Sequence, residues 1–353
     1  MPHPSLKDIA ASAGVSFQTV SKALNGKGRM SAETRRRVLD VAASLGYVPN
    51  GLARGLLNQA TATVGVLSAD FSDTTLAQIV VGIEREARRL GYSVIVGSLD
   101  EAGTDWARYL RVLLERRVDG IIFNAPSLEH ETAVGEVLPA SLPVVSLNRI
   151  AGVPHASRVF ADTFGGAAMA VRHLTSLGHR QIGMVTGKPS RAVTQLRMRA
   201  YRQVLREVDI PFDRSLVEEG DWEVEGGYRA AHRLVDRRPD LTALYVQNDM
   251  MAVGVLAALH ERRIDVPGDC SVVGCDDLPI AARTIPPLTT VQVPFQDLGV
   301  SAIRLLVERI QDPERPSTQV TLPLHMVYRD SSRTARTRAA LSSQPEGGPV
   351  SRR

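Results

Sequence analysis

Apolar residues recur at helical spacing through the first part of the chain, in three short groups separated by turns. Ser5 with Asp8 three residues later is a capping-box pattern at the start of the first group. Gly14 gives the backbone freedom that a sharp turn needs, and Ser16 and Ser31 are typical N-caps for two further helices. The residues expected to face inward are Ile9, Ala10, Ala13, Val15, Val20, Ala23, Leu24, Val38, Val41, Ala42 and Leu45. The pattern predicts a helix-turn-helix followed by a third helix.

Beyond Thr61 the pattern changes to short, nearly continuous apolar runs that alternate with amphipathic stretches. The runs are typical of buried strands, whereas the stretches at 76–90 and 106–115 have the period of helices. The expected strands cover residues 63–67, 93–96, 120–123, 143–147, 181–185, 243–246 and 271–274. This alternation predicts parallel sheets with helices on both faces, and its restart at residue 181 indicates two similar lobes.

The expected fold class is therefore α/β, with a helix-turn-helix head followed by two doubly wound parallel-sheet lobes. The expected divisions are a head at 1–48, a connecting segment at 49–60, a two-lobed body at 61–330 and a disordered tail at 331–353. Within the body, the first lobe takes about 61–161 plus 291–328, and the second lobe takes about 162–290. The tail is expected to be disordered because it is rich in Arg, Ser, Gly and Pro and has few apolar residues.

Charge is unevenly distributed along the chain. Residues 1–60 carry a net charge of +5 and residues 329–353 carry +4, within a total of +4, so the middle carries −5. A polyanion would therefore be drawn to the ends, chiefly to the helical head. There is no run of eighteen apolar residues and no signal-peptide pattern, which predicts a cytoplasmic protein. Cys270 and Cys275 have no companions at ligand spacing and are expected to act as small apolar residues.

The outer face of the second helix carries the candidate chemistry of the head: Phe17, Gln18, Ser21 and Lys22. An amide and an ammonium group can read base edges, and hydroxyls can contact phosphates, as on a recognition helix in the major groove. The alternative is a three-helix bundle whose polar face is merely solvated. Because the turn, the caps and the exposed set all agree, we expect DNA binding.

Three motifs in the head resemble a known family. Residues 6–10, 13–16 and 19–25 are similar to the opening of the LacI/GalR family of bacterial transcriptional repressors, and the resemblance continues with few gaps to about Ser332. It implies a periplasmic-binding-protein-like body and a ligand-responsive repressor that binds palindromic operator DNA, with Gln18 and Lys22 at base edges. The positions that match phosphate contacts of the family are Ser16, Thr19, Ser21, Asn25 and Arg29. The tail lacks the leucine heptads that make tetramers in the family, so we expect a homodimer.

Residues 49–57 connect the head with the body. Asn50 can cap a short helix, but Gly51 and Gly55 each cost about 0.5–1 kcal/mol relative to Ala, and so short a helix is marginal alone. We expect a segment that is disordered alone and helical when supported; an ordinary linker is the alternative. The resemblance implies a hinge helix that enters the minor groove beside its twin, with Leu56 as the apolar wedge that kinks the DNA.

Polar side chains follow the predicted strands in both lobes, and ligands of open parallel sheets bind beyond these strand ends. The candidate effector-binding residues are Asn124, Asn148, Arg197, Trp222, Asn248, Asp276 and Phe295. Planar amide, carboxylate and guanidinium groups can each hold two neighbouring hydroxyls, and aromatic rings can cover the C–H face of a sugar. We therefore expect a small sugar in a cleft between the lobes. The alternatives are core packing for Trp222 and Phe295, and an ion pair between the lobes for Arg197 and Asp276.

The resemblance supports this set, because Arg197, Trp222, Asn248, Asp276 and Phe295 match effector-contacting positions of the family. Two departures lie on the first-lobe side of the site. A sugar-responsive member has a carboxylate at the position of Asn148, and the loop at 68–76 matches poorly, so the particular sugar stays open.

In the head, Phe17 replaces a tyrosine and Lys22 an arginine of that member. The first change loses a hydroxyl, and the second loses the bidentate fork that reads guanine. We therefore expect a different operator sequence with the same two-fold layout.

Three other functions were weighed. The stretch at 183–188 approaches a phosphate-binding loop, but the glycine spacing is one residue short, and Pro189 occupies the place of the magnesium-binding Ser or Thr. No nucleotide-binding, hydrolase or metal-spaced histidine motif occurs, so we expect no enzyme, cofactor or metal. The head argues against a transport binding protein. A regulator with a purine, a sugar phosphate or a phosphoprotein as its effector is the remaining alternative.

Overall fold

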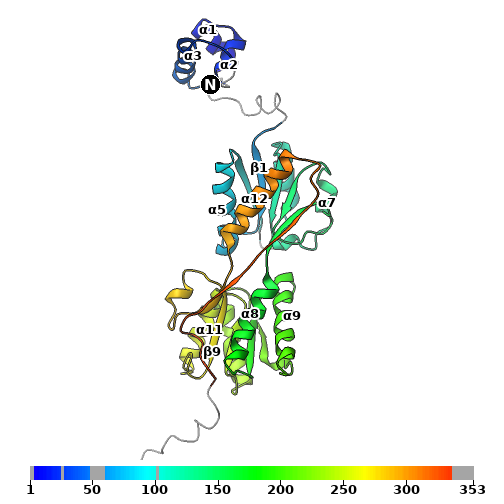
Figure 1. The fold of residues 1–353 in the computed structure, drawn as a ribbon, viewed down its shortest axis with the longest axis vertical. Helices are drawn as coiled ribbons and strands as arrows, with labels where there is room; N and C mark the ends of the chain where they lie inside the picture. The colour runs from blue at the N-terminus through cyan, green and yellow to red at the C-terminus, as the bar shows by residue number, and fades with distance from the viewer. Residues whose placement is uncertain (1–3, 25–27, 48–59, 101–102, 336–353) are drawn as a thin grey trace, which may run out of the picture. The chain divides into compact units, whose positions relative to one another are not determined.

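The computed structural model describes residues 4–24, 28–47, 60–100 and 103–335, and the chain divides into two compact units at Ala62 and Thr63 (Figure 1). The first unit contains the helices α1 (Leu6–Ala13), α2 (Phe17–Leu24) and α3 (Ala32–Ser44). The predicted capping box is confirmed, because the Ser5 amide donates to Asp8 Oδ2 at 2.8 Å and the Asp8 amide donates to Ser5 Oγ at 3.4 Å. Gly14 ends α1 with a φ of +64°, as the turn requires.

The core of the first unit consists of one small apolar cluster. Its buried members are Ile9, Ala13, Val20, Ala23, Val38 and Ala42. Leu45, which we expected to face inward, is instead 37% exposed, because it is the C-cap residue beyond the last turn that packs on α1 and α2.

The second unit contains two six-stranded sheets, as expected for two doubly wound lobes. In the first sheet the strands follow the order β11-β5-β4-β3-β1-β2, and in the second the order β12-β10-β9-β8-β6-β7. The first sheet comprises β1 (Thr63–Ser68), β2 (Ser93–Ser98), β3 (Gly120–Asn124), β4 (Val144–Ser146), β5 (Ser157–Ala161) and β11 (Gln319–Leu322). The second comprises β6 (Ile182–Thr186), β7 (Val217–Glu219), β8 (Ala243–Val246), β9 (Ser271–Asp276), β10 (Thr289–Gln292) and β12 (His325–Val327). Neighbouring strands are parallel except β10 and β12.

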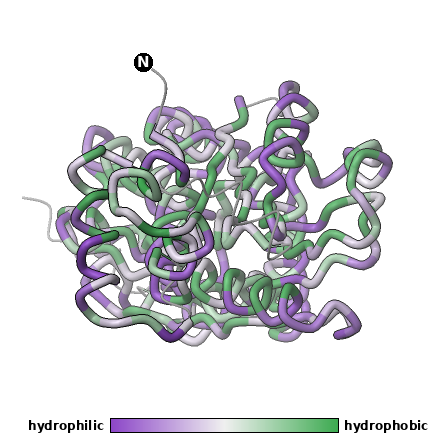
Figure 2. Tube along the Cα trace, turned by 90° about the horizontal axis from the view of Figure 1, so that it is seen from above, coloured by the Kyte–Doolittle hydropathy of each residue, from purple (hydrophilic) through white to green (hydrophobic). Residues whose placement is uncertain are grey.

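Helices cover both faces of each sheet. The first sheet has α5 (Thr74–Arg89) and α12 (Phe295–Gln311) on one face, and α6 (Trp106–Glu115) and α7 (Val134–Val137) on the other. The second sheet has α8 (Thr163–Ser176) and α9 (Ala192–Glu207) on one face, and α10 (Val224–Arg237) and α11 (Asp249–Glu261) on the other. Short 3₁₀ turns lie at η1 (Pro126–Leu128), η2 (Arg214–Leu216) and η3 (Ala281–Arg283). Hydrophobic and hydrophilic stretches alternate along the chain, as this layering requires (Figure 2).

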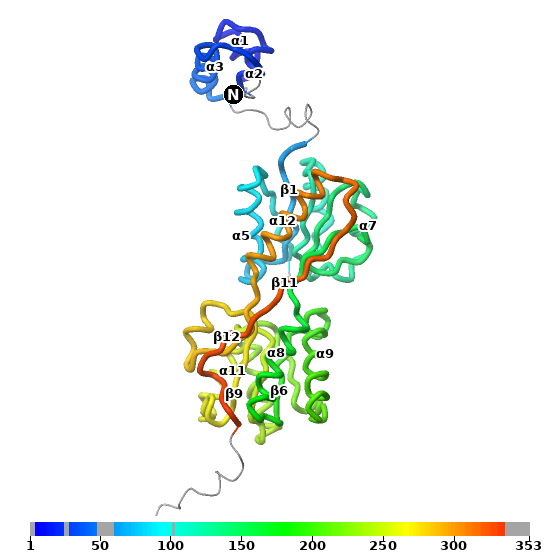
Figure 3. The backbone as a smooth tube through the Cα atoms, viewed as in Figure 1, coloured from blue at the N-terminus to red at the C-terminus, as the bar shows by residue number. Residues whose placement is uncertain are grey.

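The chain crosses between the lobes three times, after β5, before α12 and between β11 and β12 (Figure 3). The assignment of 291–328 to the first lobe is therefore wrong at both ends, because β10 and β12 belong to the second sheet. Strands β5, β7 and β10 were also missed. From the sequence the last strands are expected at about 320–327, but the sheet that each strand joins depends on which edge is free.

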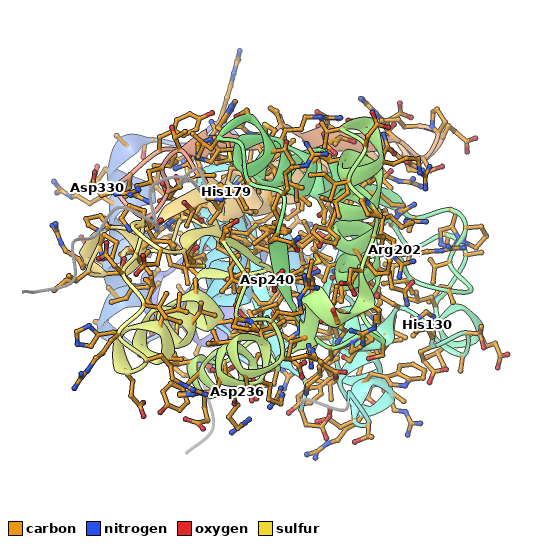
Figure 4. The ribbon with its side chains drawn as sticks, turned by 90° about the horizontal axis from the view of Figure 1, so that it is seen from below. His130, His179, Arg202, Asp236, Asp240 and Asp330 are labelled. Carbon is orange, nitrogen blue, oxygen red and sulfur yellow. The ribbon has the colours of Figure 1, made fainter. Side chains whose placement is uncertain are left out.

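The predicted disorder of the tail is wrong for residues 331–335. Ser331 is fully buried and donates to the carbonyl of Val272 at 2.6 Å, and the Arg333 amide donates to Ser271 Oγ at 3.1 Å. His179, labelled in Figure 4, lies 3.0 Å from Ser271 Oγ and from the Arg333 carbonyl, so this histidine helps to hold the segment in place. The remaining tail, 336–353, lies outside the described residues.

Cys270 and Cys275 are buried and unpaired, as expected of small apolar residues. Among the described residues, no helix is long and apolar enough to cross a membrane.

Candidate nucleic-acid interface and ligand site

The outer face of α2 carries the side chains predicted for DNA binding. Phe17, Gln18 and Lys22 are exposed, and Phe17 exposes half of its surface although it is a large apolar residue. Ser16 Oγ accepts a hydrogen bond from the Thr19 amide at 3.1 Å, so this serine caps α2 as predicted. The two hydroxyls of Ser16 and Thr19 also lie 2.8 Å apart.

The structure describes only some of the other residues predicted to contact DNA. Ser21 is half-buried on α2, and Arg29 is exposed. Asn25, Leu56 and the segment 49–59 lie outside the described residues. Their predicted roles therefore rest on the sequence alone.

A buried ion pair forms the centre of the polar set in the second lobe. Arg197 comes from α9, and its Nη2 lies 3.8 Å from Oδ1 of Asp276 at the end of β9. Its Nη1 donates to the carbonyl of Gln247, and its guanidinium carbon lies 5.8 Å from the centre of the Trp222 ring. The pair that we considered as a contact between lobes is thus formed within one lobe, where both side chains are buried.

Asn248 holds the neighbouring backbone in place. Its Oδ1 accepts from the Met251 amide at 2.9 Å and caps α11, while its Nδ2 donates to the Trp222 carbonyl at 2.8 Å. Trp222 and Asp276 have φ values of +79° and +122°, which are unfavourable for residues with a side chain. Such strain persists only where the surroundings hold it, and it collects at functional sites.

Carboxylates crowd the end of β9. Burial raises the pKa of Asp276 well above its ordinary value, and Arg197 opposes this rise; the negative charges of Asp249 and Asp73 add to it. Asp73 belongs to the first lobe, where its Oδ1 accepts from the Thr75 amide at 2.9 Å and caps α5. Asp73 is thus a first-lobe group whose charge acts on Asp276 in the second lobe.

The first lobe contributes two amide oxygens. Asn124 is buried and donates through Nδ2 to Ser68 Oγ and to the Leu76 carbonyl, both at 3.1 Å. Within the described ranges, Oδ1 of Asn124 and Oδ1 of Asn148 are buried without a hydrogen-bond partner. Phe295 is half-buried at the start of α12 and packs against the core. Part of its ring surface is therefore used in core packing.

Among the described side chains, no hydrogen bond or ion pair joins the first-lobe residues Asn124, Asn148 and Phe295 to the group around Arg197. Among the described residues, the Ala192 amide at the start of α9 donates across the lobes to Glu129 Oε2 at 3.1 Å. Sequence reasoning missed Glu129, because no local pattern marks a residue that acts on the opposite lobe. Gln247 follows β8 like a ligand residue, but its buried amide instead bonds Gly187 and Thr194.

A helix-turn-helix unit and a two-lobed body with a strained, buried polar cluster are typical of a ligand-responsive DNA-binding regulator. The profile of "Bacterial regulatory proteins, lacI family" matches residues 5–50, and that of "Periplasmic binding protein-like domain" matches residues 171–332. The lactose operon repressor of Escherichia coli (strain K12) is 32% identical over 95% of this chain and 92% of its own length.

Two solved structures are also similar. The lac repressor dimer bound to operator and the anti-inducer ONPF has a TM-score of 0.86 and 31% identity, over 94% of this chain and 100% of that one. The complex of the transcriptional regulator CelR with cellobiose has a TM-score of 0.71 and 31% identity, over 93% of this chain and 100% of that one. The chain therefore belongs to the LacI family. It is a transcriptional regulator of the repressor type and not an enzyme.

Proposed function

We propose that this regulator is a homodimeric repressor of palindromic operator DNA whose affinity for the operator is set by a small neutral sugar bound between the two lobes. The observation that carries the sugar is the buried Arg197–Asp276 pair beside Trp222, together with the unpartnered amide oxygens of Asn124 and Asn148 in the first lobe. Because Asp276 compensates the charge of Arg197, the site suits hydroxyl groups better than an anion. The similar CelR structure contains cellobiose, which supports the same class of ligand here.

The DNA-binding half of the proposal rests on the exposed face of α2. Gln18 and Lys22 read base edges, and Ser16, Thr19, Ser21, Asn25 and Arg29 contact phosphates. The similar lac repressor structure is a dimer on operator DNA, which supports a two-fold operator here. A regulator with this role acts in the cytoplasm, where the chromosome lies.

The sugar favours one arrangement of the lobes and thereby changes the state of the hinge segment at 49–60. Coupling energies of about 1–3 kcal/mol are typical, which correspond to a five- to 150-fold change in operator affinity. Release of DNA by the sugar is the direction that we propose. A purine, a sugar phosphate or a phosphoprotein is the second candidate for the effector; a phosphate would need more unpaired positive charge than the Arg197 site offers.

The test is a thermal-shift screen against monosaccharides and disaccharides, with purines and sugar phosphates beside them. One neutral sugar should raise the melting temperature by an amount that grows with its concentration. Asp276→Asn should lose this shift while still binding operator, and Asp236→Asn, an exposed carboxylate of α10, should keep it. Stabilisation only by purines or phosphates would refute the sugar and leave the DNA-binding role in place.

A further inference from the structure

A polar hollow lies in the first lobe, between the loop that joins β4 to β5 and the segment that leads into β11. Its volume is about 350 Å³, and its walls include Ser146, Arg149, Arg158, Thr318 and Gln319. This volume is within the range of roughly 300–1,000 Å³ that small-molecule sites occupy. None of the candidate effector-binding residues lines it.

The charge of this hollow is not compensated. Arg149 and Arg158 are its only charged lining residues, and within the described ranges neither forms an ion pair. Two other half-buried arginines, by contrast, are paired: Arg329 lies 2.6 Å from a carboxylate oxygen of Asp277, and Arg238 lies 2.5 Å from one of Asp213 and 2.9 Å from one of Asp240. Two unpaired guanidinium groups in one hollow attract an anion.

Arg158 lies in the wall on β5, an interior strand of the first sheet. In the register of the sheet it is the partner of Ser146 on one side and of Gln319 on the other, so the three side chains share a face. Its guanidinium carbon lies 5.4 Å from the centre of the Phe160 ring. Its Nε is buried and has no hydrogen-bond partner among the described residues, and leaving such a donor unsatisfied is costly.

Hydrogen bonds from α12 and from the start of β11 stabilise the wall around Arg158. Arg309 of α12 donates to Ser157 Oγ at 3.1 Å and to the His155 carbonyl at 3.0 Å. The same Ser157 oxygen accepts from the Thr318 amide at 3.0 Å, which ties the β4–β5 loop to the start of β11. The hollow is therefore bounded by segments that are bonded to one another.

We propose that this hollow binds the phosphate or carboxylate group of a small metabolite, with the guanidinium groups of Arg149 and Arg158 as its ligands. The site goes beyond the sugar site between the lobes and does not depend on it. Arg149 directly follows Asn148, and Ser146 donates to the Asn148 carbonyl, so an anion here would contact the loop that carries one of the predicted effector residues.

The experiment titrates the full-length protein with inorganic phosphate and separately with citrate, by calorimetry and by thermal shift, with sodium chloride at equal ionic strength as the reference. At least one anion should bind saturably to the native protein. Arg158→Gln and Arg149→Gln should each weaken that binding by about tenfold or more. Arg149 is exposed, so its variant tests the site even if Arg158→Gln fails to fold.

Arg111→Gln, at an exposed position of α6 in the same lobe, is the matched control and should bind like the native protein. Binding of phosphate alone would assign the site to phosphorylated ligands, and binding of citrate alone to carboxylates. No saturable binding of either anion, or an equal loss in all three variants, would overturn the proposal. Binding of the neutral sugar is measured in parallel, so that failure of the anion-site proposal can be distinguished from failure of the sugar-site proposal.

Discussion

At the scale of single residues, the carboxyl group of Asp249 shows how the site is held. Its two oxygens accept hydrogen bonds from Thr290 Oγ1 at 2.6 Å and from the Leu278 amide at 2.8 Å, which fixes the turn after β9. Burial raises the pKa of Asp249 to about 7, and the two hydrogen bonds only partly oppose this rise. The sequence places Asp249 next to Asn248, but nothing in that neighbourhood marks it as a buried acid.

Replacement of this acid by an amide should change how stability depends on pH. The folded protein keeps the Asp249 proton up to about pH 7, whereas the unfolded chain releases it near pH 4, so this stabilisation is complete below about pH 4 and is lost as the pH rises to 7. Asp249→Asn cannot lose a proton. Its melting temperature, measured by calorimetry from pH 4 to 8, should therefore fall less with rising pH than that of the native protein. Asp236→Asn should keep the native slope, and equal slopes in all three would contradict the assignment.

At the scale of elements, glycines let paired helices approach closely. A Cβ atom at Gly254 of α11 would lie 1.9 Å from the Val224 carbonyl oxygen of α10, and one at Gly227 would lie 2.1 Å from the Met251 carbonyl oxygen. In the first lobe, a Cβ atom at Gly82 of α5 would lie 2.1 Å from the Gln296 carbonyl oxygen of α12. One at Gly299 of α12 would lie 2.1 Å from the Ile79 carbonyl oxygen of α5. These contacts involve backbone, which cannot turn aside as a side chain can.

Gly254→Ala should therefore destabilise the second lobe. Helix propensity alone would favour Ala by about 1 kcal/mol, but overpacking of the crossing should outweigh this and leave a net loss of about 1–3 kcal/mol. Urea unfolding measures the change. Ala257→Gly, at an exposed position of the same helix, should cost only about 0.5–1 kcal/mol. A gain of stability in Gly254→Ala would show that the helices do not cross this closely.

The connecting segment is the second element that carries a prediction, and it rests on the sequence. If Leu56 is the wedge in the minor groove, Leu56→Ala should weaken operator binding by far more than binding to unrelated DNA, because only the operator complex is kinked there. Affinities for both DNAs at one salt concentration measure this. Asn58→Ala, two residues further along the chain, serves as the comparison. An equal loss on both DNAs would remove the wedge role.

At the scale of the whole molecule, several large apolar side chains remain exposed on the second unit. Ile285 is 93% exposed, Ile280 is 43% exposed, and Val96 lies on β2, the edge strand of the first sheet. Single exposed apolar residues are common, but an edge strand and a nearly fully exposed isoleucine are features that proteins usually cover. The proposed homodimer provides a second copy of this chain to cover them.

Ile285→Asp should therefore shift the protein toward monomer, since the charge would be buried against the partner. Light scattering over a range of concentrations measures the dissociation, which should change by about tenfold or more. Val208→Asp replaces an exposed valine at the end of α9 and should leave the dimer intact. A monomeric native protein, or an Ile285→Asp variant that stays fully dimeric, would contradict this surface.

The sequence by itself determined the elements whose cause is local. The capping box at Ser5, the turn at Gly14 and the helix after Ser16 follow from interactions and backbone preferences within a few residues. The continuous apolar runs predict the central strands because both faces of those strands are covered. The type of residue at strand ends likewise pointed to Asp276, and the family resemblance pointed to Arg197. Tertiary structure decided what depends on distant neighbours: that β10 and β12 join the second sheet, that Arg197 and Asp276 pair within one lobe, and that Ser331 is buried. Sheet membership and pairing are set by the free edge and by the groups that burial brings together, and no local pattern in the chain records either.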